Sequence, residues 1–322
     1  MRAIVHHRYG SPDVLELRDV EVPAAAEDEV LVRVRAASVN PLDWHGVTGT
    51  PYVMRIRSGL RAPRDVRVGV DFAGTVEAVG ASVERLRPGD DVFGARTGAF
   101  AEHVAVPVDR AAPKPAGLTF ERAAAVPVAA LTALQGLRDR GGLRAGQKVL
   151  VNGASGGVGT FAVQIAKALG ADVTGVCSPG NVELARSLGA DAVVDYTRED
   201  FTLADDRYDV LLDVAGSRSW SECTRVLAPG AKLVVVSGPK TNRWLGPLTH
   251  LARMRLASMR GSRRAVPFLT KTDADDLITL AGMIEAGAVT PVIDRTYGLD
   301  EARDALRYVG EGHARGKVVL VI

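Results

Sequence analysis

The sequence predicts an α/β protein with two domains, one rich in short β-strands and one built on a doubly wound parallel sheet. The chain has 322 residues, which is too long for one ordinary hydrophobic core. Hydrophobic residues make up 47% of it and aromatic residues only 5%, which is typical of α/β proteins rich in alanine, valine and leucine. The apolar pattern changes at about residue 120, from short strands to apolar runs separated by helices.

Short strands separated by turns account for the first part of the chain. Residues 30–35 alternate between apolar and polar side chains, as a half-buried strand does, and residues 75–79 do the same before Gly80. Residues 88–91 read Pro-Gly-Asp-Asp, a turn signal that precedes a short strand over 92–94. Because no helical pattern intervenes, we expect a compact, mostly β unit here.

Helices alternate with apolar runs from residue 120 onward, which predicts a parallel sheet covered on both faces. Residues 120–138 are expected to form a helix with a kink at Pro127. An edge strand over 266–269 would tolerate Pro267. The other expected helices cover 157–169, 182–188 and 273–286, and the other expected strands cover 148–151, 173–176, 192–194, 210–212, 233–236, 289–295 and 317–322.

Composition excludes several classes of protein. The net charge of +2 gives no reason to expect a nucleic-acid or membrane partner. No apolar run is long enough for a signal peptide or a membrane span of roughly 20 residues. The two cysteines, Cys177 and Cys223, form no disulfide framework, and we expect both to be small buried hydrophobes. A reducing, cytoplasmic location fits this composition best.

An arginine-rich segment covers residues 243–264. The plain interpretation is a solvated helix and loop, because the chain as a whole is nearly neutral. The alternative is a basic lip that attracts phosphate. Aromatic residues are sparse there, with Trp244 alone, so the segment does not predict a platform for RNA or single-stranded DNA.

A glycine-rich loop over residues 152–159, Asn-Gly-Ala-Ser-Gly-Gly-Val-Gly, is the strongest single motif. It lies between an expected strand and an expected helix, as a dinucleotide-binding loop must. Ala154 stands where the first glycine of that motif is usual. The alternative is a glycine-rich turn with no ligand. The loop residues predicted to bind pyrophosphate are Ser155, Gly156, Gly157 and Val158, at the helix start.

The end of the second strand of this domain decides which dinucleotide binds. An NAD site places an acidic residue there, on the ribose 2′-hydroxyl, but residues 175–181 contain no Asp or Glu. Ser178 and Asn181 can donate hydrogen bonds to a 2′-phosphate, although no arginine stands in this loop. NADPH is therefore favoured over NADH. Ser178 has a second interpretation, as the cap of the following helix.

With these motifs placed, the chain resembles the medium-chain dehydrogenase/reductase superfamily, and within it the zinc-free quinone oxidoreductase-like (zeta-crystallin-like) branch. The markers are residues 40–44 (Asn-Pro-Leu-Asp-Trp), 69–74 (Gly-Val-Asp-Phe-Ala-Gly), 87–94, the glycine-rich loop, 188–191 with 195–196, and 313–317 (His-Ala-Arg-Gly-Lys). The resemblance implies a GroES-like catalytic domain over 1–121 and 288–322, and a Rossmann domain over 122–287. It also implies hydride transfer from NADPH to a quinone or an α,β-unsaturated carbonyl compound.

The same resemblance implies roles for single residues. It places Asn40 beside the nicotinamide, although an Asx turn before Pro41 remains the alternative. Tyr52 would orient substrate or supply a proton, and a plain packing role is equally open. Asp43 would face the cleft, although Asp43 and Asp71 are expected mainly to hold backbone donors. The remaining residues that the resemblance implies for cofactor binding are Thr132, Tyr196, His313, Ala314 and Arg315. For Arg315, an exposed charge without a role in binding is equally open.

Zinc-dependent relatives use cysteine and histidine ligands, and this sequence departs from them. Its first 176 residues contain no cysteine. The Gly-His-Glu motif of the zinc-dependent relatives is replaced by Gly69-Val70-Asp71 here. His45 and His103 are expected to be exposed or hydrogen-bonded, so we expect no metal site. The alternatives are a zinc-free alcohol dehydrogenase-like enzyme and a non-catalytic NADPH-binding sensor or structural protein. Relatives are often homodimers that pair edge strands, which Pro267 makes uncertain here.

Overall fold

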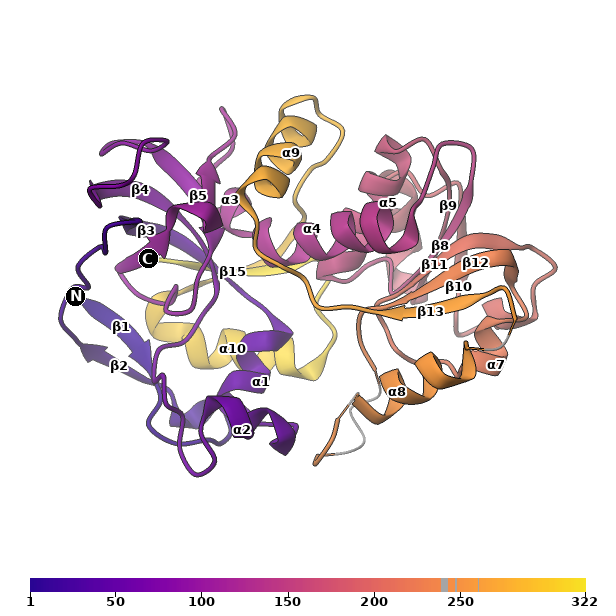
Figure 1. Ribbon diagram of the computed structural model, residues 1–322, viewed down its shortest axis with the longest axis horizontal. Coiled ribbons are helices and arrows are strands. Elements are labelled where there is room, and N and C mark those ends of the chain that lie inside the picture. Colours follow the sequence, from indigo (N-terminus) through magenta and orange to yellow (C-terminus); the bar gives the residue numbers. More distant parts are fainter. Residues whose placement is uncertain (239–242, 247, 260) are drawn as a thin grey trace. The chain divides into compact units, whose positions relative to one another are not determined.

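The computed structural model describes residues 1–238, 243–246, 248–259 and 261–322, so Arg260 of the arginine-rich segment lies outside the described residues. The chain divides into two compact units (Figure 1). Unit 1 comprises residues 1–128, 271–287 and 291–322, and unit 2 comprises 129–270 and 288–290. None of the described helices is both long and apolar enough to cross a membrane.

These boundaries differ from the expected ones at three places. Residues 122–128 and 271–287 group with unit 1, and residues 288–290 group with unit 2. Packing explains why 271–287 belongs to unit 1, because helix α9 (Ala274–Glu285) lies on strand β7 (Ala111–Pro113). Hydrophobic periodicity predicts such a helix correctly but does not reveal which sheet it covers.

Unit 1 is built on a mostly antiparallel sheet with the order β14-β15-β3-β4-β5-β7, and β6 also pairs with β3. Along β3, Val30, Val32 and Val34 point into the core, which confirms the predicted alternation. The C-terminal strand β15 lies between β3 and β14 in this sheet. Its strands are β3 (Glu29–Val39), β4 (Asp71–Val79), β5 (Asp91–Ala95), β6 (His103–Pro107), β7, β14 (Ile293–Gly298) and β15 (Lys317–Val321), beside the separate pair β1 (Arg2–Val5) and β2 (Glu16–Asp19).

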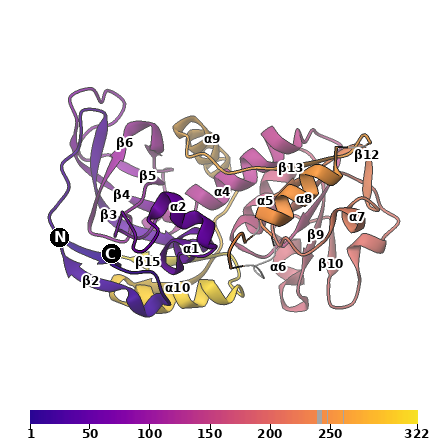
Figure 2. The ribbon, with the colours of Figure 1, turned by 60° about the horizontal axis from the view of Figure 1, so that its bottom comes forward.

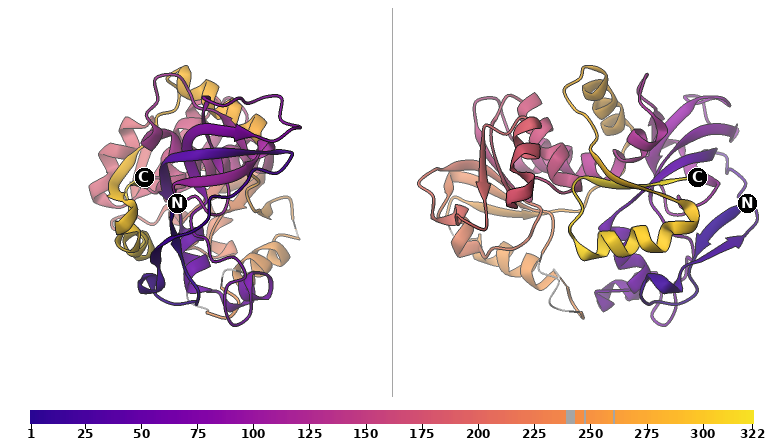
Figure 3. Two further views of the ribbon diagram at one scale, coloured as in Figure 1. Left: turned by 90° about the vertical axis from the view of Figure 1, so that its left-hand side faces the viewer. Right: turned by 180° about the vertical axis from the view of Figure 1, so that it is seen from behind.

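Two helices of unit 1 pack together beside this sheet, α1 (Pro41–Thr48) and α10 (Ala302–Glu311), as Figure 3 shows. Helix α1 starts where it does because Pro41 is well suited to the first helical position. It ends at Gly49, whose φ of 59° is the left-handed conformation that glycine adopts without penalty. Unit 1 also contains the short helices η2 (Tyr52–Met54), α2 (Arg55–Ser58) and α3 (Phe120–Ala124).

Unit 2 contains a parallel six-stranded sheet with the order β10-β9-β8-β11-β12-β13, which confirms the predicted doubly wound topology. Pro267 lies in the edge strand β13, where a missing backbone donor is tolerated. The six strands are β8 (Lys148–Asn152), β9 (Asp172–Cys177), β10 (Ala192–Asp195), β11 (Tyr208–Asp213), β12 (Leu227–Val235) and β13 (Arg264–Pro267).

Helices cover both faces of this sheet (Figures 1 and 2). The expected helix over 120–138 breaks before Pro127 and continues as a π-helix, η4 (Gln135–Gly141), whose glycines lie against Leu212 and Val210. On the other face, Leu211 packs in a cluster with Cys223 and Met254. The helices of this unit are α4 (Pro127–Leu134), η4, α5 (Gly157–Ala168), α6 (Val182–Ser187), α7 (Trp220–Cys223) and α8 (Leu248–Ala257), and α4 starts in unit 1.

Candidate functional site

The glycine-rich loop of unit 2 joins the end of β8 to the start of α5. A Cβ atom on Gly159 would lie 2.0 Å from the carbonyl oxygen of Gly153, so only glycine allows the helix to approach the loop this closely. The departure at Ala154 also has a reason. Its methyl group is buried against Gly175 of β9, where a Cβ would lie 3.0 Å away, so β9 supplies the missing small residue. The first backbone N–H groups of α5 remain available for an anion.

Three predicted residues meet beside this loop. The amide nitrogen Nδ2 of Asn181 donates to Ser155 Oγ at 3.1 Å and to Ser178 Oγ at 2.9 Å. Asn181 is buried, and its Oδ1 atom has no hydrogen-bond partner among the described residues. An unpaired buried acceptor is costly, so this cluster is incomplete without a ligand or water. The Ser178 side chain does not cap the following helix, which leaves its hydroxyl for the cluster.

Tyr196 and Thr132 lie elsewhere in unit 2. Tyr196 directly follows β10, and its N–H donates to the carbonyl oxygen of Cys177, the residue before Ser178. Its side chain is 55% exposed. Thr132 is buried on α4, with its hydroxyl 2.6 Å from the hydroxyl of Thr270. Tyr196 therefore lies near the end of β9, whereas Thr132 has its own hydroxyl partner on the segment that follows β13.

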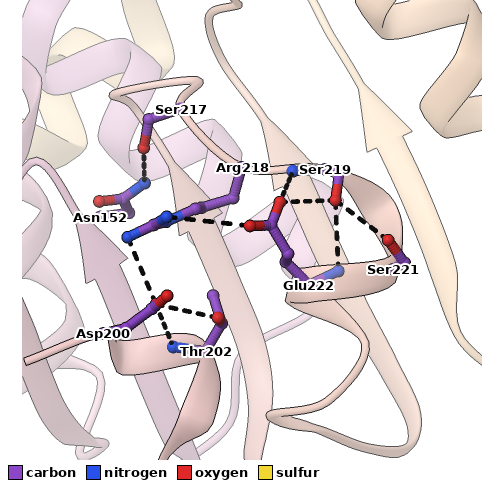
Figure 4. A network of polar contacts seen from close by, with 8 residues as sticks. All are labelled: Asn152, Asp200, Thr202, Ser217, Arg218, Ser219, Ser221 and Glu222. Carbon is purple, nitrogen blue, oxygen red and sulfur yellow. Dashed lines mark hydrogen bonds and ion pairs between the residues drawn. The ribbon is translucent and has the colours of Figure 1, made fainter.

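A further polar group at the carboxyl edge of the sheet was missed by sequence reasoning. Asn152 at the end of β8 donates to Asp213 at the end of β11 at 2.8 Å. It also donates to Ser217 Oγ at 3.4 Å, as Figure 4 shows. Burial raises the pKa of Asp213, whose Oδ2 atom has no partner among the described residues. Ligands of doubly wound sheets bind at this edge. The signal in the sequence was a polar residue ending each of two apolar strands.

Arg218, next along the same loop, is held by acids instead. Its guanidinium lies 3.3 Å from Asp200 and 3.8 Å from Glu222 (Figure 4). Glu222 also accepts the N–H of Ser219, which begins α7 with a capping box. The charge of Arg218 is thus balanced within unit 2, and this arginine is a poor candidate for binding phosphate.

Unit 1 contains a buried charged cluster where β3 ends. Asp71, the first residue of β4, is fully buried, and its carboxylate accepts hydrogen bonds from four groups. The donors are Ser38 Oγ at 2.9 Å, Asn40 Nδ2 at 2.9 Å, the backbone N–H of Val128 at 3.0 Å and Lys317 Nζ at 3.4 Å. The expectation that Asp71 holds backbone donors is confirmed. It joins the end of β3, the start of α4 and the start of β15.

The orientation of the Asn40 amide follows from this cluster. Its Oδ1 atom accepts from Lys317 Nζ at 2.6 Å, while Nδ2 faces the Asp71 carboxylate and the carbonyl oxygen of Ser38 at 3.4 Å. An ammonium on one side and a carboxylate on the other fix which end is oxygen. Both amide N–H groups are therefore used within the protein, which favours the interpretation of Asn40 as a residue that shapes the turn. In the sequence, Lys317 stands out only as the last residue of the 313–317 motif.

Asp43 lies in the first turn of α1 and accepts the backbone N–H of Asn40 at 2.7 Å, so it too holds a backbone donor as expected. Burial, aided by the nearby charge of Asp71, raises the pKa of this carboxyl to about 7, against the opposing effects of the Asn40 N–H hydrogen bond and of Lys317. Asp43 therefore loses its proton near neutral pH rather than near pH 4.

Tyr52 lies in η2 and is half-buried. The Arg55 guanidinium lies 4.6 Å from the centre of the Tyr52 ring and 4.3 Å from that of Tyr9, so it is stacked on both. Arg55 also donates to the carbonyl oxygen of Gly49 at 2.8 Å, which ties this segment to the end of α1. His45 Nδ1 lies 2.6 Å from the carbonyl oxygen of Thr50, as expected for a hydrogen-bonded histidine.

The predicted residues of the 313–317 motif lie in unit 1, between α10 and β15. His313 and Arg315 are exposed, and Ala314 packs on the core of unit 1. The backbone N–H of Arg315 donates to Asp294 at 2.9 Å, which leaves its guanidinium at the surface. These three residues thus share a unit with Asn40 and Asp43, whereas the glycine-rich loop belongs to unit 2.

Comparisons with known proteins agree with this architecture. Two family models match, the alcohol dehydrogenase GroES-like domain over residues 26–116 and the zinc-binding dehydrogenase over 188–320. The chain is 35% identical to the 2-methylene-furan-3-one reductase of Solanum lycopersicum, and 33% identical to the chloroplastic NADPH-dependent alkenal/one oxidoreductase of Arabidopsis thaliana. Both alignments cover 99% of this chain and 79% of the relative. Escherichia coli quinone oxidoreductase complexed with NADPH has a TM-score of 0.83 and 26% identity, with each chain covered completely.

Proposed function

The chain belongs to the quinone oxidoreductase-like branch of the medium-chain dehydrogenase/reductase superfamily, and from this premise we propose that it reduces quinones or α,β-unsaturated carbonyl compounds with NADPH and without zinc. The observation that carries the choice of cofactor is the cluster of Ser155, Ser178 and Asn181. It offers two hydroxyl groups and one amide, with an unpaired amide oxygen, where an NAD site would place a carboxylate.

This cluster fits a 2′-phosphate in its donor chemistry. Each serine hydroxyl can donate or accept, so the Asn181 amide can turn either end toward a ligand. The acid at the end of β10, Asp195, accepts hydrogen bonds from the N–H and the hydroxyl of Thr197, which hold its pKa low. The relative from Arabidopsis thaliana is named NADPH-dependent, and the Escherichia coli structure contains NADPH, which supports the same choice.

The donors of the described residues support a reaction without zinc. In the part of the chain that the structure describes, no group of three or more His, Cys, Asp and Glu side chains could hold a metal ion. Asp71, which takes the place of the glutamate in the Gly-His-Glu motif of the zinc-dependent relatives, already binds the ammonium group of Lys317. A cation next to that ammonium would be repelled, so we propose chemistry that depends on hydrogen bonding instead.

The proposed mechanism assigns separate tasks to the two units. NADPH, when bound, would supply the hydride, and the N-terminus of α5 would hold its pyrophosphate. Lys317 and Asp71 hold the Asn40 turn in one conformation, so that the reacting carbonyl meets a fixed backbone rather than a mobile one. We propose that the Tyr52 hydroxyl donates a hydrogen bond to the carbonyl oxygen, on which negative charge develops.

Cofactor oxidation by the purified protein tests the proposal. We expect NADPH to be consumed with 1,4-benzoquinone or an enone, NADH to be consumed much more slowly, and neither to be consumed without an acceptor. Metal analysis of the same sample should find no stoichiometric zinc. Tight NADPH binding without turnover on any acceptor would instead indicate a sensor or structural protein. Oxidation of a secondary alcohol in place of these reductions would indicate the alcohol dehydrogenase alternative.

Tyr52→Phe tests the role of the hydroxyl. The substitution keeps the ring on which Arg55 stacks, so the fold of this segment should be unchanged. Loss of a donor to a developing oxyanion lowers kcat by about 100-fold or more, whereas kcat stays unchanged if Tyr52 contributes only the packing of its ring, which Phe retains. The change in kcat, measured with saturating NADPH, therefore separates the two interpretations of Tyr52.

We also propose that the protein works in a reducing compartment such as the cytoplasm, because both cysteines are unpaired and buried. Burial raises the pKa of Cys223 to about 12, so this thiol is inert at neutral pH. A homodimer that pairs the edge strand β13 is the assembly we propose to test first, by sedimentation of the purified protein.

A further inference from the structure

The charge of the chain is distributed very unevenly. Residues 223–272 hold ten of its 40 Lys and Arg residues and none of its 38 Asp and Glu residues. The net charge of +2 hides this concentration, because the rest of the chain is acidic. Helix α8 (Leu248–Ala257) lies in the middle of this basic stretch, and its arginines are not explained by the proposed reaction.

Helix α8 has a second face that carries exposed apolar side chains. On its inner face, Met254 and Leu251 join the core under the sheet. Residues four apart share a helix face, and the outer face presents Leu248, Ala252 and Leu256. Met259 continues this row just beyond the helix. The exposed fractions are 47% for Leu248, 69% for Leu256 and 71% for Met259. We call Leu248, Ala252, Leu256 and Met259 the α8 stripe.

Arginines flank the α8 stripe on both sides. Arg253 and Arg255 are exposed on the helix, and Arg243 is exposed on the segment before it. Arg255 donates to the backbone carbonyl of Ala265, and Arg263 to those of Leu227 and Ala228. None of these four arginines forms an ion pair with a carboxylate of any residue that the structure describes. Their charges are therefore not balanced within the protein.

We propose that the α8 stripe and its flanking arginines dock on a membrane surface that contains anionic lipids. Leucine and methionine side chains on one face of a helix enter the boundary between headgroups and acyl chains, and flanking arginines bind the lipid phosphates. Each basic residue close to an anionic membrane adds to the electrostatic attraction between the protein and the lipid surface. The proposal does not depend on the reductase activity, although apolar quinones and enones dissolve in the same membranes.

A second copy of the chain fits this face less well. A twofold axis through the α8 stripe would bring the arginines of one copy against the same arginines of the other. No acidic residue between 223 and 272 is available to compensate for that repulsion. Anionic lipids supply the missing negative charge, which is why the membrane is the occupant we favour.

Co-sedimentation of the purified full chain with vesicles tests this proposal. The vesicles contain phosphatidylcholine alone or an equal mixture with phosphatidylglycerol, at low and at physiological salt. We expect binding to the mixed vesicles, and weaker binding as salt shortens the range of charge attraction from about 30 Å at 0.01 M to about 8 Å at 0.15 M. Arg243→Gln/Arg253→Gln should weaken binding on the order of thirty-fold, and Leu256→Ser/Met259→Ser should also weaken it.

Two matched controls make the result specific to this surface. Arg186→Gln/Arg198→Gln removes the same charge from arginines that pair with Glu183 and Asp195, and Leu203→Ser/Ile278→Ser removes exposed apolar side chains elsewhere. Neither should change vesicle binding. Absence of binding to mixed vesicles at low salt overturns the proposal. So does a result in which Leu256→Ser/Met259→Ser dissociates a dimer and leaves vesicle binding unchanged, because the stripe is then an interface between copies.

Discussion

Lys317 Nζ lies 2.6 Å from Asn40 Oδ1 in the interior of unit 1, although the two residues are 277 positions apart in the chain. The lysine enters on the C-terminal strand β15, and the asparagine ends the strand β3 that pairs with it. Their contact fixes the Asn40 side chain, so the C-terminal strand helps to determine the geometry of the proposed active-site turn.

Lys317→Met should destabilise unit 1 by about 3–5 kcal/mol, because it leaves the Asp71 carboxylate buried without its cation. Urea unfolding measures the change. In a Trp220→Phe/Trp244→Phe background, Trp44 fluorescence reports on unit 1 alone. Lys167→Met is the matched control, since Lys167 pairs with Asp191 at the surface, and it should cost about 1 kcal/mol or less. Equal effects of the two substitutions would contradict a buried ion pair at Asp71.

The contribution of Asp43 to the stability of unit 1 should fall as pH rises from about 4 to about 7. Asp43 has its pKa raised to about 7, so the native state keeps a proton that the unfolded chain releases near pH 4. The contribution of Asp43 to the free energy of unfolding is fully present below pH 4 and is lost as pH rises through 7. Between these values the free energy of unfolding changes by up to about 1.4 kcal/mol per pH unit. Asp43→Asn should remove that slope when the same Trp44 signal is followed. An unchanged slope would show that Asp43 titrates normally.

Ser178→Asp should shift cofactor preference from NADPH toward NADH. The new carboxylate would repel a 2′-phosphate and could accept the 2′-hydroxyl of NADH. We expect kcat/KM for NADPH to fall by about 10- to 100-fold, with NADH unaffected or improved. Ser187→Asp, an equal change of charge on the exposed end of α6, controls for long-range electrostatics. If both variants lower kcat/KM for NADPH equally, the phosphate does not bind at Ser178.

Gly159→Ala should abolish tight NADPH binding and lower the Tm, because its methyl group would overlap the carbonyl oxygen of Gly153. Gly282→Ala is the control. A Cβ there meets nothing within 4 Å inside helix α9, so alanine should stabilise that helix by about 0.5–1 kcal/mol. Fluorescence titration with NADPH and thermal unfolding measure both effects. A Gly159→Ala protein that binds normally would show that the loop can relax.

Much of the fold was predictable because period-2 and helical patterns report burial directly. The apolar strands, the break at Pro127 and the edge position of Pro267 follow from local chemistry. The partners of Asp71 could not be predicted in this way. Ser38, Val128 and Lys317 are far apart in the sequence and come together only when β3 and β15 pair and α4 packs beside them. The same holds for Asn152 and Asp213, which meet at a sheet edge from two separate strands.

The path of the chain through unit 1 has a consequence for synthesis on the ribosome. Residues 129–270 are continuous and contain the whole parallel sheet of unit 2, so that sheet can form as soon as they emerge. Unit 1 waits for β15, and until Lys317 emerges Asp71 has no cation to accompany it into the core. The first unit to begin translation is therefore the last to finish folding, and its nascent strands stay exposed to chaperones in the interval.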